Sequence, residues 1–151
     1  MTPAERIAAV EARRAAARAE VAAAHAEQQA TDLEALADLE EAHGYERILR
    51  IDINGWDVGQ GAATLVVARV PKASEKVFKR FQETVAASKK GATASSAAAE
   101  TLARSCLVYP SPESAKALYD ATIDLAPGIL GHVALQIVEA VQGRAEEEKK
   151  G

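Results

Sequence analysis

The sequence predicts an α+β protein that is mostly α, with a long N-terminal Ala-rich helix, one β-hairpin and then a compact set of about four short helices. Three observations support this fold class. Residues 4–43 contain neither Gly nor Pro, and thirteen of the first thirty residues are Ala, the strongest helix former. Between residues 45 and 70, two runs of β-branched residues have the composition of strands. From residue 71 to 142, Pro and Gly separate several short apolar stripes with helical spacing.

These changes in pattern predict three segments: a helical arm at 1–44, a β-hairpin plus helical domain at 45–142, and a charged tail at 143–151. The strands and the last three helices each have their own apolar face, whereas the face of the arm is mostly Ala. We therefore expect residues 45–142 to fold without the arm, and we expect the charged tail to fray.

The arm begins and ends with recognisable signals. Thr2 is placed to cap the helix, Pro3 suits its first turn, and Glu5 completes the spacing of a capping box. Gly44 ends the helix.

A sparse apolar stripe runs along the arm at spacings of three and four, through Ile7, Val10, Ala17, Val21 and Ala24. Arg14 and Gln28 take two positions of this stripe, so it buries little area and does not predict a strong stand-alone coiled coil. A denser stripe follows at Leu33, Leu36 and Leu39. We predict that a partner protein binds the arm through Val10, Val21, Leu33 and Leu36.

The middle of the chain predicts a β-hairpin. One strand is expected at Tyr45–Ile53, where apolar and charged residues alternate, and a second at Ala62–Val70, which is rich in β-branched residues. Asn54-Gly55 begins the turn of a loop of about eight residues. Trp56 lies in this loop, where it either faces solvent as an anchor for a partner or folds back over the sheet. We include Trp56 among the predicted partner-binding residues.

Four helices are expected after the hairpin. They are predicted at Ser74–Ser88, with Phe78 and Phe81 on its apolar face, at Thr93–Val108, from Ser111-Pro112-Glu113 onward, and from Pro127 to about Gln142.

Composition and charge exclude several functional classes. A net charge of −4 provides no basic stripe for a nucleic acid. No apolar run is long enough to cross a membrane and no leader precedes the first helix, so we expect no membrane partner and a cytoplasmic location. Residues 1–44 hold four Arg and nine Asp or Glu, concentrated at Asp32–Glu41. Solubility explains this acidity more simply than a basic partner does.

No motif predicts catalysis or ligand binding. Asp52–Asp57 resembles the start of a calcium loop but lacks the required glycine and the closing glutamate. Gly59–Gly61 precedes a strand rather than a helix, which favours a hairpin loop over a phosphate cradle. The three His share no metal-binding spacing, and the single cysteine, Cys106, lies on an apolar stripe where a buried, inert thiol is expected. We expect no catalytic, cofactor-binding or metal-binding residues, and a protein that is not an enzyme.

Several features of residues 45–142 occur together in one known family. They are the hairpin, Val70-Pro71 before a helix with Phe78 and Phe81, a helix ending in Ala103–Pro110, the capped Ser111-Pro112-Glu113 start, and an apolar helix after Pro127-Gly128. In this arrangement the chain resembles the small tail assembly chaperones of long-tailed bacteriophages and prophages. The long Ala-rich arm departs from the shorter members of that family.

The resemblance implies a non-enzymatic protein that coats the apolar tape measure protein in the bacterial host cytoplasm before the tail tube polymerises around it. It also implies a homo-oligomer. A longer frameshifted form at Lys149-Lys150 would add a domain for tail tube subunits, although a solvated charged tail is the simpler interpretation of these lysines. Two other classes stay open: a structural component of a virion or complex that oligomerises through its N-terminal helix, and a transcriptional or adaptor module that uses the arm as a coiled coil.

Overall fold

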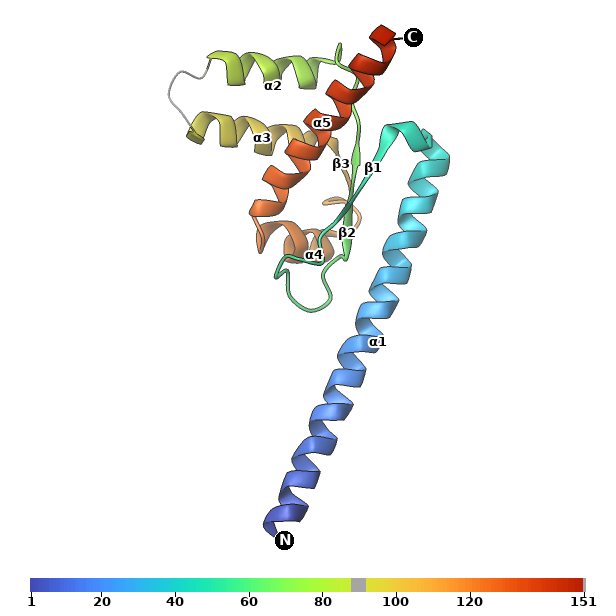
Figure 1. The fold of residues 1–151 in the computed structure, drawn as a ribbon, viewed down its shortest axis with the longest axis vertical. Coiled ribbons are helices and arrows are strands. Elements are labelled where there is room, and N and C mark those ends of the chain that lie inside the picture. Colours follow the sequence, from blue (N-terminus) through green and yellow to red (C-terminus); the bar gives the residue numbers. More distant parts are fainter. Residues whose placement is uncertain (88–91, 151) are drawn as a thin grey trace.

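The computed structural model describes residues 1–87 and 92–150, with side chains described in 1–87 and 96–147. The elements are α1 (Pro3–His43), a 3-10 turn (Tyr45–Arg47), β1 (Ile48–Asp52), β2 (Leu65–Arg69), α2 (Lys76–Ala87), α3 (Ala92–Cys106), β3 (Leu107–Tyr109), α4 (Lys116–Tyr119), a π-helix (Asp120–Asp124) and α5 (Gly128–Lys150). The predicted fold class, mostly α with a β-hairpin, is confirmed (Figure 1). The predicted end of the first short helix, at Ser88, lies outside the described residues.

α1 is one continuous helix of 41 residues. Thr2 Oγ1 accepts a hydrogen bond from the backbone N–H of Glu5 at 3.2 Å, which confirms the predicted cap. Gly44, with a φ of +89°, takes a conformation that other residues rarely adopt, and the helix ends there. At about 1.5 Å per residue, α1 is roughly 60 Å long. It therefore extends well beyond the rest of the molecule (Figure 1).

The three strands form one antiparallel sheet in the order β1-β2-β3. β1 pairs with β2 over its whole length, with Ile48 opposite Arg69. β3 pairs with the other edge of β2, with Leu107 opposite Ala68. β2 is therefore the central strand, and its residues Leu65–Ala68 are buried on both faces.

The two faces of the sheet pack against different helices. The larger core lies on one face and includes Phe78 of α2, Leu102 of α3 and apolar residues of α5. The smaller core lies on the opposite face, where Leu65 and Val67 of β2 pack with Leu36 of α1. The sheet thus lies between the end of α1 and the other helices (Figure 1).

The structure contains a strand where the sequence predicts the end of a helix. α3 ends at Cys106, and Leu107–Tyr109 forms β3 instead of the last residues of the predicted 93–108 helix. Pro110 disfavours helical backbone at Tyr109. β2 also offers a second edge for pairing, and that edge is distant in the sequence, so local spacing does not reveal it.

Other boundaries also differ from the prediction. β1 and β2 begin at Ile48 and Leu65, three residues later than expected, and Tyr45–Arg47 forms the 3-10 turn. α4 begins at Lys116 rather than at Ser111 and continues as a π-helix at Asp120–Asp124. α5 continues through Lys150, so the segment predicted as a frayed tail is helical over the described residues. Gly143 costs this helix only about 1 kcal/mol, and strong helix formers surround it.

Candidate functional site

A buried carboxylate attaches α1 to the sheet. Asp32 is 0% exposed. Its Oδ2 accepts hydrogen bonds from the backbone N–H and from the hydroxyl of Thr64, both at 2.6 Å. Its Oδ1 accepts one from Nε2 of Gln28 at 2.8 Å and one from the hydroxyl of Tyr109. Each carboxylate oxygen therefore has two donors, which satisfies its lone pairs.

The carboxylate also affects Tyr109. Burial, followed by the hydrogen bond to Asp32, raises the pKa of the Tyr109 hydroxyl above its ordinary value. Ionisation would place a second negative charge beside the carboxylate, so the hydroxyl stays protonated and continues to donate. A buried charge is stable only when donors surround it. The cluster therefore fixes α1 at one position along the sheet.

Leu36 belongs to the interior rather than to a binding surface. It is 7% exposed and packs with Ile48, Leu65 and Val67. The prediction that Leu36 binds a partner is therefore wrong, and Asp32 is likewise not part of a solvated acidic face. Both errors have one cause: periodicity shows which residues share a helix face, but not what that face packs against.

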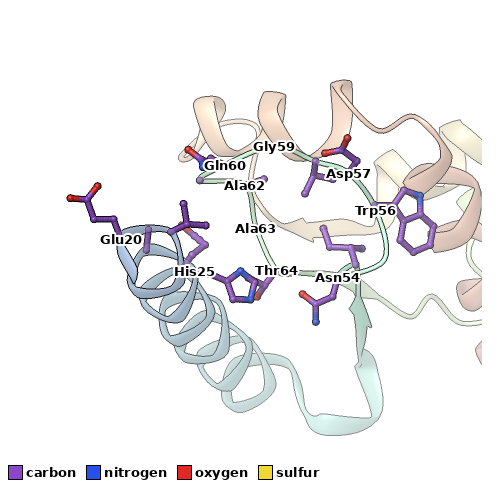
Figure 2. Close-up of a pocket in the computed structure, with 16 residues that line it drawn as sticks. Glu20, His25, Asn54, Trp56, Asp57, Gly59, Gln60, Ala62, Ala63 and Thr64 are labelled. Carbon is purple, nitrogen blue, oxygen red and sulfur yellow. The ribbon is translucent and has the colours of Figure 1, made fainter. Parts of the chain in front are cut away.

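Beyond the Asp32 cluster, an open cleft of about 600 Å³ separates α1 from the β1–β2 loop. The helix wall consists of Glu20, Val21, Ala24, His25 and Gln28, and the loop wall runs from Ile53 to Thr64. Figure 2 shows His25 directed toward the loop and Glu20 at the rim. The backbone N–H of Ala63 donates to Oγ1 of Thr122 at 2.9 Å and so holds the loop on the π-helix.

The amino-terminal part of α1 is exposed over residues 3–27. Val10 and Val21, which were predicted to bind a partner, are 43% and 47% exposed, and Leu33 is 38% exposed. Ile7, which was not included in that prediction, is 59% exposed. Ile7 and Val10 line a shallow depression near the tip of the arm, with Arg6 among its borders. The apolar stripe of the arm is thus accessible to a partner.

Trp56 folds back instead of facing solvent freely, but onto α5 rather than onto the sheet. Its ring lies 4.9 Å from that of His132, measured between centroids. A Cβ added to Gly128 would lie 3.4 Å from Nε1 of Trp56, so this glycine allows the indole to approach the start of α5. The indole points to the side of the loop away from α1 (Figure 2). Trp56 therefore holds the loop in place, and its ring remains half-buried.

A second surface, which none of the predicted partner-binding residues lines, is a groove of about 680 Å³ between α2 and α3. Its residues are Lys76, Val77, Arg80, Phe81, Thr84, Ala97, Ala98, Thr101, Leu102 and Ser105. Phe78 is buried beneath α2, whereas Val77 and Phe81 are only partly buried and line the groove. One feature of the sequence could have indicated this groove: the cations Lys76 and Arg80 share a helix face with Val77 and Phe81.

A metal site and a reactive thiol each place requirements on the described residues. The described residues contain no group of three or more His, Cys, Asp or Glu that could hold a metal ion. Cys106 is 0% exposed within the larger core, which confirms its predicted burial. Burial raises the pKa of the Cys106 thiol, and a higher pKa lowers the fraction of nucleophilic thiolate.

Within the described residues, no single helix has the length and hydropathy needed to cross a membrane. Lys116–Asp124 and Gly128–Glu147 together meet these criteria as a pair bent by 90°. In this structure, Ile129, Val133 and Ile137 of that pair are 0% exposed in the larger core.

No protein-family model, curated protein or solved structure matches this chain. A function is therefore inferred from the surfaces described above.

Proposed function

We propose that this protein is a non-enzymatic tail assembly chaperone of a long-tailed bacteriophage or prophage. It binds and covers the tape measure protein in the bacterial host cytoplasm before the tail tube polymerises. A tape measure protein presents a long amphipathic helix that would aggregate alone. Its chaperone therefore needs an open apolar groove that accepts such a helix without a pocket for one small ligand.

The groove between α2 and α3 is the observation that carries this proposal. Its apolar lining includes Val77, Phe81 and Leu102, and α3 adds the small residues Ala97, Ala98 and Ser105. Lys76 and Arg80 border it, so it suits an apolar helix face that is flanked by acidic residues. Helix-in-groove binding uses this combination of an apolar floor and a charged border.

A specific observation also favours the second candidate, a structural component that oligomerises through its N-terminal helix. Residues 3–27 of α1 are exposed, and the apolar stripe along them is accessible. A permanent oligomerisation helix has the same appearance before assembly. The two candidates differ in the surface that each function requires: the chaperone requires the groove whether or not α1 also pairs, whereas the structural component requires α1 alone.

The proposal requires a tape measure gene close to this one, and co-expression of this chain with the product of that gene tests the proposal. The tape measure protein is expected to stay in the soluble fraction only when this chain is present. Ala97→Glu places a charge in the groove at an exposed position and should abolish that protection without unfolding the chain. Leu135→Glu is the matched control, because Leu135 is 55% exposed and lies outside the groove.

Equal protection by the wild type and by Ala97→Glu would show that the tape measure protein binds outside the groove. An insoluble tape measure protein in the presence of the wild-type chain would contradict the chaperone proposal itself.

A further inference from the structure

The arm carries opposite charges on its two halves. Residues 1–18 contain four Arg and two Glu, whereas residues 19–44 contain seven Asp or Glu and neither Arg nor Lys. Two arms aligned in parallel would place acidic residues beside acidic residues. An antiparallel alignment places the basic half of each arm beside the acidic half of the other, which lowers the electrostatic energy.

The apolar stripe of α1 lies on the side of the helix that faces the cleft. Val21, Ala24 and Gln28 line the cleft, and steps of seven residues place Ile7, Val10 and Ala17 on the same face. Over residues 3–27 this face is exposed. A stripe with this repeat suits pairing with a second helix along its length.

We propose that two copies of this chain pair through their arms in an antiparallel alignment, and that the tip of each arm occupies the cleft of the other copy. The occupant of the cleft is thus residues 3–10 of a second copy. The interface is isologous, because both copies contribute the same surface.

The charges determine the register. With Val10 opposite Val21 of the second copy, Ile7 falls opposite Ala24. The flanking positions then pair Arg6 with Glu27, Arg13 with Glu20, and Glu11 with Arg18. Two-fold symmetry repeats each of these pairs, and none of the flanking pairs joins like charges.

The same register explains the interruption at Arg14. This residue falls opposite Ala17 of the second copy, whose small side chain leaves room for the aliphatic stem to lie along the interface while the guanidinium reaches solvent. A parallel alignment of the stripe lacks such compensation, because it brings Arg13 beside Arg18 of the second copy.

The cleft provides a third wall for the incoming helix. Ile7 and Val10 of the second copy would lie against Ala24 and Val21, with Ile53 and Val58 of the β1–β2 loop across the cleft. The loop is already fixed by the hydrogen bond to Thr122 and by the packing of Trp56 on α5. The open space beside the helix therefore matches the position that the second arm must take.

Sedimentation equilibrium of the full chain over a range of concentrations tests this pairing. The wild type is expected to show a reversible monomer–dimer equilibrium. Arg13→Glu should weaken the dimer roughly tenfold, because the introduced carboxylate would face Glu20 of the second copy at two symmetric positions. Adding Glu20→Arg should restore the affinity. Both positions have only Ala or Val three and four residues away, so neither change disturbs an ion pair within the helix.

Glu34→Arg is the control and should leave the affinity of the dimer unchanged. It reverses a charge at an exposed position outside the paired region. A tighter dimer for Arg13→Glu would indicate parallel arms and overturn the proposal. Failure of Glu20→Arg to restore affinity would overturn the register. A wild-type chain that stays monomeric at all concentrations would overturn the proposal that a second copy occupies the cleft. The same conclusion would follow if only added tape measure protein covered the arm.

Discussion

Asp32 occupies a helix position that an apolar residue normally fills. It lies one turn after Gln28 and one turn before Leu36, on the face of α1 that packs against the sheet. Its carboxylate receives the backbone N–H and hydroxyl of Thr64, the residue that precedes β2. An apolar side chain would bury the same area but would leave these donors without an acceptor.

Asp32→Ala is expected to lower the free energy of unfolding by about 3 kcal/mol, because it leaves the buried donors of Thr64 and the partly buried hydroxyl of Tyr109 without their acceptor. Chemical denaturation followed by circular dichroism measures this loss. Asp38→Ala is the control: Asp38 lies on the same helix but is exposed, so its change should be within about 0.5 kcal/mol. Equal losses for both variants would contradict the role of Asp32.

At the scale of elements, α1 has two parts with different contacts. Residues 28–43 supply Asp32 and Leu36 to the sheet, whereas residues 3–27 are exposed. The helix stays continuous across this division because Ala, Glu and Gln have high helix propensity and no Gly or Pro interrupts them. Intrinsic propensity therefore maintains the free part, and tertiary packing maintains the attached part.

Leu36→Ala and Leu33→Ala compare a buried side chain with an exposed side chain on the same turn of α1. Leu36→Ala removes a side chain that is 7% exposed and should cost about 2–4 kcal/mol of stability. Leu33→Ala acts on a side chain that is 38% exposed and should cost less than about 1 kcal/mol. Thermal unfolding of both variants measures the difference. A larger loss for Leu33→Ala would show that α1 packs on the sheet with another face.

At the scale of the whole molecule, the sequence-based boundary at residue 44 coincides with the end of α1, whereas the packing boundary lies near residue 28. The smaller core of Ile48, Leu65 and Val67 is closed by Leu36. Removal of the whole arm would therefore uncover one face of β2. The expectation that residues 45–142 fold alone stays a prediction. Loss of the arm should nevertheless lower the stability of these residues.

Two truncations measure that cost. Deletion of residues 2–18 removes only exposed positions and should leave the Tm of the monomer unchanged. Deletion of residues 2–42 removes both Asp32 and Leu36, so it should lower stability by about 3 kcal/mol or more and the Tm by roughly 10 °C or more. Calorimetry at concentrations where the full chain is monomeric provides the comparison. Equal Tm values for the two truncations would show that α1 contributes nothing to the fold.

Local sequence signals were sufficient for much of the fold. The Thr2 cap, the uninterrupted Ala-rich helix, Gly44 and the two β-branched runs predict α1 and the hairpin, and the structure has them there. The same signals also predicted that Cys106 is buried and that Val10 and Val21 are accessible to a partner. In each case the deciding interaction lies within a few residues along the chain or within one helix face.

Contacts between distant segments decided the rest. The strand at Leu107–Tyr109 exists because β2 offers it an edge, Asp32 is buried because Thr64 and Tyr109 surround it, and the cleft exists because the β1–β2 loop is held on the π-helix. The sequence alone determined α1, the β-hairpin and the apolar faces of the helices, since these follow from local backbone and side-chain chemistry. Only the tertiary structure decided which faces meet, because that depends on the simultaneous packing of segments that are far apart in the sequence.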